Sequence, residues 1–195
     1  MGFTARAALS ALRPDAVVDV VELVGAVVRW NRELIGHLAD APLLDPRVRV
    51  IEGDVAGAIA TAREHYDAIL LDVDNGPEAF THKENTHLYS LAGLRRARKA
   101  LRPNGVLAIW STFASHAFTA RLREADLETR LMRVRANRHS NRRHSLWLGR
   151  RSIASAPDAW AHALAVQCPF PYRRKRATQV PQIARPDAPA SSIVR

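Results

Sequence analysis

The amino-acid sequence predicts an α/β fold built on a doubly wound, mostly parallel β-sheet that closes with a C-terminal antiparallel hairpin. Short apolar segments rich in β-branched residues alternate with segments whose apolar residues recur at helical spacing, which is typical of a parallel sheet with helices on both faces. The last two strand-like segments follow each other without a helix between them, which predicts the hairpin.

The predicted elements alternate from the N-terminus to the hairpin. Helices are expected at residues 4–12, 24–39, 55–64, 86–101 and 115–126, and strands at residues 16–23, 47–51, 66–72, 106–110, 128–136 and 144–150. Thr4 can cap the first helix, and Pro103 and Gly105 end the fourth. The segment from Ala68 to Leu71 is wholly apolar, as in a strand buried on both faces.

The chain divides into a domain and a tail. Its 195 residues allow one domain with a substantial core, which we place at residues 1–152. A weak helical extension is expected at 153–168. Pro, Arg, Ser and Ala dominate residues 169–195, which predicts a basic, disordered tail.

Charge and composition restrict the class of protein. Residues 1–103 hold 13 Lys/Arg and 14 Asp/Glu, whereas residues 104–195 hold 16 and 5. The basic half, including the hairpin arginines Arg133, Arg135 and Arg143, fits either a solvated surface, which we favour, or a nucleic-acid partner. No apolar run approaches about 18 residues and the start lacks the apolar core of a signal peptide, so a cytoplasmic protein without a membrane span is expected.

A metal site is not expected. Cys168 is the single cysteine, so the chain can form neither an internal disulfide nor a zinc site made of cysteines. The histidines lack carboxylates at ligand spacing.

Acidic residues stand where three successive predicted strands end. Glu22 ends the first, Gly53-Asp54 follows the second, and Asp72 ends the third. The carboxyl ends of parallel strands share one edge of the sheet, which is where open α/β sheets bind ligands. This series of strands that end in acidic residues resembles the class I S-adenosylmethionine-dependent methyltransferase fold, a Rossmann-like architecture.

Within that fold the sequence is most similar to the spermidine synthase (polyamine aminopropyltransferase) family. The resemblance rests on the segment from Leu70 to Pro77, on Asp45-Pro46-Arg47-Val48 before the Gly-Asp strand, and on Phe80-Thr81 and Leu88-Tyr89 before the long helix. It implies S-adenosylmethionine or its decarboxylated form as the cofactor, without a metal.

The resemblance also implies roles for the strand-end residues. Gly2 resembles the last glycine of the family's glycine-rich loop. Glu22 would bind the ribose hydroxyls of the cofactor, although it can also cap the following helix. Gly53 and Asp54 would contact the adenine, although Asp54 is equally suited to cap the next helix. Asp72 would contact the cofactor and orient or deprotonate the attacking amine; the alternative is a loop acid without a ligand.

Residues after Asp72 are candidates for substrate binding. Asp74, Asn75 and Glu78 would extend an acidic rim suited to a cation, and Tyr89 belongs to the same shared pattern. The family has its second acid where Asn75 stands here, and this departure weakens the case for a polyamine acceptor.

The family's first strand and most of its glycine-rich loop are missing from the sequence. Their absence would leave a slot of about 9–10 Å between the strands at 16–23 and 66–72, with unpaired backbone groups on both sides. Three explanations are open: the protein starts about 30–80 residues further upstream, which we expect; another segment fills the slot; or the two strands close up.

The sequence therefore predicts a spermidine synthase-like group transferase that acts on a small molecule. A polyamine is one candidate for this acceptor. The alternatives are a small-molecule or RNA methyltransferase on the same fold, and a non-catalytic remnant. A homodimer is open, and a nucleic-acid partner is open but not favoured.

Overall fold

A seven-stranded sheet organises the protein. The computed structural model describes residues 2–73, 77, 87–135, 141–153 and 191–194. The strand order is β2-β1-β7-β3-β4-β6-β5, with parallel pairing from β2 through β4 and antiparallel pairing of β6 with β4 and β5. The predicted fold class, a mostly parallel sheet with an antiparallel hairpin, is confirmed. Within the described part of the chain, no helix has both the length and the apolar character that a membrane crossing requires.

The elements follow the predicted alternation. The strands are β1 (Val17–Glu22), β2 (Val48–Glu52), β3 (Tyr66–Leu71), β4 (Leu101–Ser111), β5 (Glu128–Arg135), β6 (Arg143–Arg150) and β7 (Ser191–Val194). The helices are α1 (Phe3–Ala11), α2 (Gly25–Glu33), α3 (Val55–Thr61), α4 (Leu91–Ala100) and α5 (His116–Glu124), with 3₁₀ turns η1 (Gly36–Ala39) and η2 (Pro42–Leu44).

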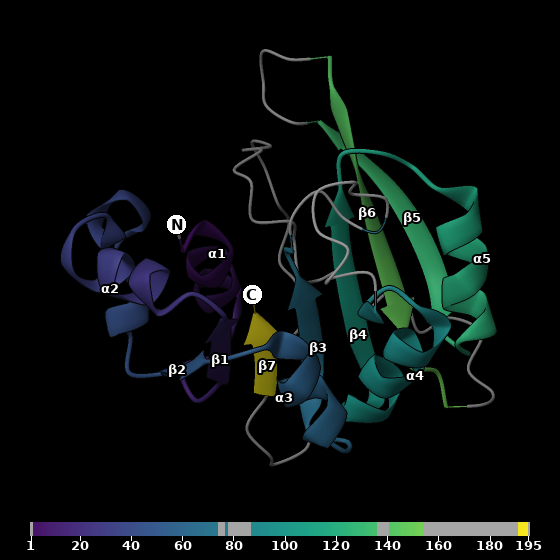
Figure 1. Cartoon of the computed structure of the whole chain (residues 1–195), viewed down its shortest axis with the longest axis horizontal. Helices are drawn as coiled ribbons and strands as arrows, with labels where there is room; N and C mark the ends of the chain where they lie inside the picture. Colours follow the sequence, from purple (N-terminus) through teal and green to yellow (C-terminus); the bar gives the residue numbers. More distant parts are fainter. Residues whose placement is uncertain (1, 74–76, 78–86, 136–140, 154–190, 195) are drawn as a thin grey trace, which may run out of the picture.

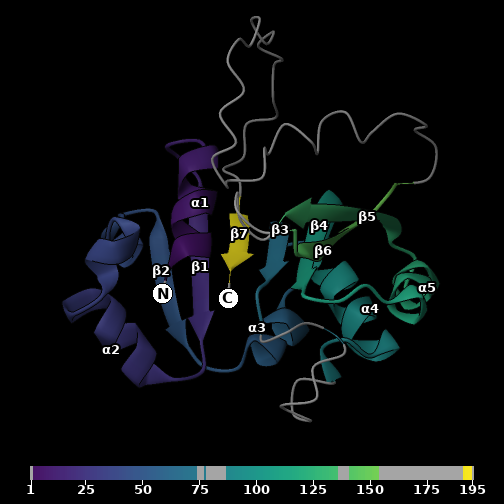
Figure 2. The ribbon, with the colours of Figure 1, turned by 90° about the horizontal axis from the view of Figure 1, so that it is seen from above.

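The end of the chain supplies the middle of the sheet. Figures 1 and 2 show β7 between β1 and β3, and it runs parallel to both. Ile193 pairs with Asp19 of β1 on one side and Ile69 of β3 on the other. Of the three explanations for the missing strand, the structure therefore shows a segment that fills the slot, and the two flanking strands do not close up. The prediction of a disordered tail is wrong for residues 191–194, because two open strand edges offer them hydrogen-bond partners.

The two faces of the sheet are covered differently. On one face, α3, α4 and α5 bury a continuous core that includes Ile69, Leu94, Phe118 and Trp147. On the other face, α1 lies over β1, and Leu9 and Val18 form a small cluster. Alternate residues of a strand point to opposite faces, so β1 and β3 each contribute side chains to both clusters.

Helices α2 and α4 are much shorter than predicted, and α3 and α5 are slightly shorter. The single helix predicted for residues 24–39 is divided in the structure: α2 ends at Glu33, and the two 3₁₀ turns follow it. Asp40 and Ala41, with φ of 56° and 48°, have left-handed backbones, so no helical structure continues directly past Ala39. Helix α4 begins at Leu91 rather than near 86, because the Ser90 hydroxyl accepts a hydrogen bond from the Gly93 amide and caps it.

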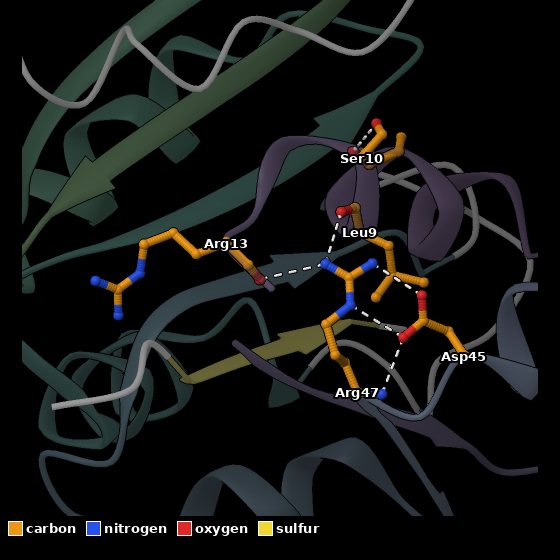
Figure 3. Close-up of polar contacts among 6 residues, drawn as sticks. Leu9, Ser10, Arg13, Asp45 and Arg47 are labelled. Carbon is orange, nitrogen blue, oxygen red and sulfur yellow. Dashed lines mark hydrogen bonds and ion pairs between the residues drawn. The ribbon is translucent and has the colours of Figure 1, made fainter. Parts of the chain in front are cut away.

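Arg47, which precedes β2, forms hydrogen bonds with the end of α1 (Figure 3). Arg47 donates from Nε and Nη2 to the Asp45 carboxylate at 3.0 and 2.8 Å, and from Nη1 to the carbonyls of Leu9 and Arg13 at 3.1 and 3.3 Å. The bidentate pair with Arg47 lowers the pKa of Asp45 to about 2. The Asp45-Pro46-Arg47-Val48 motif thus orients the helix that leads away from the ligand edge.

Candidate active site

A cavity of about 290 Å³ lies at the carboxyl ends of β1 and β3. Its walls are the start of α1, the end of β1, one side of α2, Leu43 of η2 and Asp72, which follows β3. Parallel strands that flank a central strand bring their ends to this edge, as is usual for ligand sites in α/β sheets. The volume is at the lower end for small-molecule pockets.

Three of the predicted site residues line this cavity together. They are Gly2, Glu22 and Asp72. Gly2 precedes α1 with φ of +73°, and a Cβ there would lie 2.8 Å from Cγ of Pro42, so both the backbone and the packing require glycine. The carboxylates of Glu22 and Asp72 are the charged groups among the described lining residues, which include no Lys, Arg or His.

Each carboxylate already accepts one hydrogen bond from the protein. Glu22 Oε1 accepts from the Val24 amide at 3.0 Å, a local contact just before α2, and it does not cap that helix, whose cap position is Val24 and which has no side-chain cap hydrogen bond. Asp72 Oδ2 accepts from the Thr4 hydroxyl at 2.7 Å, which joins the end of β3 to the first turn of α1. Among the described residues, the second oxygen of each carboxylate has no donor, so both can still bind a ligand.

Thr4 has a different role from the predicted one. The sequence predicts that it caps α1, but the helix starts one residue earlier and Gly2 occupies the cap position without a side-chain hydrogen bond. The Thr4 hydroxyl is therefore free to orient Asp72. Sequence reasoning missed this contact because it joins residues that are 68 positions apart.

Gly53 and Asp54 lie outside the cavity lining. They follow β2, where the Gly53 amide donates to the Glu22 carbonyl at 2.9 Å. Asp54 Oδ1 accepts from the Ala56 amide at 2.9 Å and caps α3, so the capping alternative is realised. A Cβ on Gly53 would meet nothing within 4 Å, which leaves open space beside this backbone.

Tyr89 lies in the core rather than at the cavity. Its hydroxyl donates to the Val73 carbonyl at 3.1 Å, and its ring packs edge-on against Phe118 with centroids 5.9 Å apart. It thereby supports the backbone that follows Asp72. The other predicted substrate-binding residues, Asp74, Asn75 and Glu78, lie outside the described residues.

Asn31 also lines the cavity, although the sequence did not single it out. It lies on α2 at helical spacing from Val27 and Val28, so a polar residue interrupts the apolar stripe of this helix. That interruption is the signal by which the sequence alone could have identified it.

Comparisons with known proteins identify a family and agree with the fold. A model of the spermine/spermidine synthase domain matches residues 12–121. Putrescine N-methyltransferase 2 of Nicotiana tabacum is 36% identical over 93 residues, which are 46% of this chain and 24% of the relative. Polyamine aminopropyltransferase 1 of Streptomyces coelicolor is 33% identical over 104 residues, 51% of this chain and 19% of the relative.

A solved structure shares the fold. Spermidine synthase from Thermotoga maritima superposes with a TM-score of 0.55 at 13% identity, over 73% of this chain and 55% of that one. This chain therefore spans about a quarter or less of the curated relatives that it matches. Since the family model matches more than half of its residues, the chain belongs to the spermine/spermidine synthase family.

Proposed function

We propose that this chain provides the cofactor- and amine-binding part of a group transferase that acts on a small polyamine-type amine. The observation that carries the proposal is the convergence of Glu22 and Asp72 on one cavity without a described cationic side chain in its lining. The whole chain has a formal net charge of +10, so an acidic cavity is a local feature rather than a result of composition. Such a cavity favours a cationic ligand.

The residues present fit S-adenosylmethionine or its decarboxylated form. The second Glu22 oxygen is suited to accept hydrogen bonds from vicinal hydroxyls at the end of β1. Gly53 and Asp54, at the end of the neighbouring strand β2, remain candidates for contact with the adenine ring of the cofactor. When bound, the cofactor supplies a carbon activated by an adjacent sulfonium.

Asp72 is the proposed general base. A polyamine is cationic near neutral pH, and one nitrogen must lose a proton before it can act as a nucleophile. With Oδ2 fixed by the Thr4 hydroxyl, the other oxygen of Asp72 can hold the ammonium and accept its proton. Asp74, Asn75 and Glu78 remain proposed contributors to the acceptor site.

Methyl transfer and aminopropyl transfer both fit this arrangement, and the matched relatives are named for both chemistries. The two reactions require different forms of the cofactor. Calorimetry with S-adenosylmethionine, decarboxylated S-adenosylmethionine and methylthioadenosine therefore separates them. Preference for the decarboxylated form favours aminopropyl transfer, because two carboxylates repel the carboxylate of S-adenosylmethionine. Absence of binding by all three favours the non-catalytic alternative.

The variant Asp72→Asn tests the role of the base. It keeps the shape of the side chain but cannot accept the proton, so turnover should fall by about 100-fold or more, and by much more than cofactor affinity falls. Asp40→Asn is the matched control, since Asp40 is an exposed carboxylate that pairs with Arg6 away from the cavity. Unchanged turnover of Asp72→Asn would refute the assignment.

A further inference from the structure

The amide side chain of Asn31 has an unused acceptor at the ligand cavity. Asn31 is 5% exposed and lies on the side of α2 that faces the cavity. Its Nδ2 donates to the Val27 carbonyl at 2.8 Å, and because a carbonyl can only accept, this bond fixes which end of the amide is the oxygen. Among the described residues, Oδ1 has no hydrogen-bond donor.

The surroundings of Asn31 are closely packed. A Cβ on Gly36 would lie 2.0 Å from the Asn31 carbonyl oxygen, so the chain turns tightly against the end of α2. At the other side, Oδ1 lies 3.5 Å from the position that a Cβ on Gly2 would occupy. Oδ1 therefore lies beside Gly2, the residue that precedes α1 and lines the cavity.

An acceptor buried without a donor is costly to the folded state, and most buried polar groups are satisfied. Some buried polar side chains of this protein follow that rule: Asp19 accepts from Arg49 and Tyr66, and Ser115 caps α5. Others do not, since the hydroxyls of Thr112 and Ser145 and Nδ1 of His144 also lack a partner among the described residues. Asn31 differs from these three because it lines the cavity. A ligand that supplies a donor would remove the cost.

We propose that Asn31 Oδ1 accepts a hydrogen bond from the ammonium group of the ligand's amino-bearing chain. This inference rests on the proposed function. An ammonium is the donor that the cavity selects, because Glu22 and Asp72 are its charged lining groups and both are negative. Asn31 would thus distinguish ligands that carry the amine from those that lack it.

The test compares decarboxylated S-adenosylmethionine with methylthioadenosine, which lacks the aminopropyl chain, by calorimetry on the full chain. In Asn31→Leu, affinity for decarboxylated S-adenosylmethionine should fall by about tenfold or more, while affinity for methylthioadenosine changes by less than about threefold. Asn31→Asp retains an acceptor and should keep the preference for the amine-bearing ligand. Both variants lose the Nδ2 bond to Val27, so the loss of that bond cannot account for a difference between them. Asn31→Asp also adds a negative charge, which should strengthen rather than weaken the preference for the amine-bearing ligand.

Val28→Ala is the matched control on the same helix, since Val28 is buried and lines the same cavity. This variant should lower the affinity for both ligands by the same factor. If Asn31→Leu lost affinity for both ligands equally, or kept the full preference for decarboxylated S-adenosylmethionine over methylthioadenosine, the role of Asn31 would be overturned. The proposed function would remain intact. Absence of binding by the unaltered chain would refute the proposed function and this inference with it.

Discussion

The two faces of the sheet differ in how much apolar structure supports them. The face under α3, α4 and α5 holds a continuous cluster that extends from Val21 to Trp147, whereas Leu9 and Val18 are the buried members of the cluster under α1. The cavity borders the α1 side. The face under α3, α4 and α5, the thick face, therefore fixes the strands, whereas the face under α1, the thin face, leaves room for a ligand at the strand ends.

The largest expected effect comes from truncating the thick face. Phe118 is 1% exposed and packs edge-on against Trp147 with ring centroids 5.1 Å apart. Phe118→Ala should lower the free energy of unfolding by about 3–5 kcal/mol, because neighbouring rings cannot fill the void. Leu9→Ala, the matched truncation on the thin face, should cost about 2–3 kcal/mol. Urea unfolding measures both, and equal losses would contradict the contrast between the faces.

The second prediction concerns β7, which lies between β1 and β3 in the middle of the sheet. Ile193→Pro removes one backbone donor from the middle of the sheet and should cost about 2–3 kcal/mol, since its partner carbonyl is left unsatisfied. Hydrogen exchange should accelerate in β1 and β3 together. Ile153→Pro is the control, because Ile153 is exposed and lies outside the strands. Unchanged exchange in β1 and β3 would show that β7 does not hold the slot in solution.

The sequence predicted the two faces better than it predicted the centre of the sheet. Strands β1 and β3 were identifiable because each is an apolar run that ends in an acid, and this spacing also placed Glu22 and Asp72 at one edge. Strand β7 was missed because four residues within a tail rich in Pro, Arg and Ser carry no recognisable period. Its strand conformation depends on the open edges of β1 and β3, which are tertiary features.

The site was predictable only in part, for a similar reason. A strand-end carboxylate can be recognised from local sequence, but its partners cannot. The contact of Thr4 with Asp72 and the unsatisfied oxygen of Asn31 arise only when α1 and α2 pack at the cavity. Tyr89 was assigned to the substrate by resemblance, whereas its ring is needed in the thick core.

The third prediction concerns acid stability on the thin face. Arg47 lowers the pKa of Asp45 from 3.8 to about 2, so the pair stabilises the fold above about pH 4 and the stabilisation is lost as the pH falls toward 2. Asp45→Asn should cost about 1 kcal/mol near neutral pH and flatten the pH dependence of the urea midpoint in this window. Asp15→Asn, which alters the more exposed pair with Arg13, is the control. An unchanged acid slope in Asp45→Asn would contradict the assignment.

The smallest effect concerns a link on the thick face between the strands that flank β7. The Tyr66 hydroxyl of β3 donates to Asp19 of β1 at 3.3 Å, and burial together with the Asp19 charge raises the pKa of Tyr66 from 10 to about 12. Because the folded state holds this proton more tightly, stability should fall as the pH rises from 10 to 12. Tyr66→Phe should lose about 0.5–1 kcal/mol near neutral pH, since a long bond is lost, and should lack that alkaline decline. Urea unfolding of both proteins across this pH range measures it. Parallel declines would show that the Tyr66 hydroxyl does not cause the alkaline loss of stability and does not join β1 to β3.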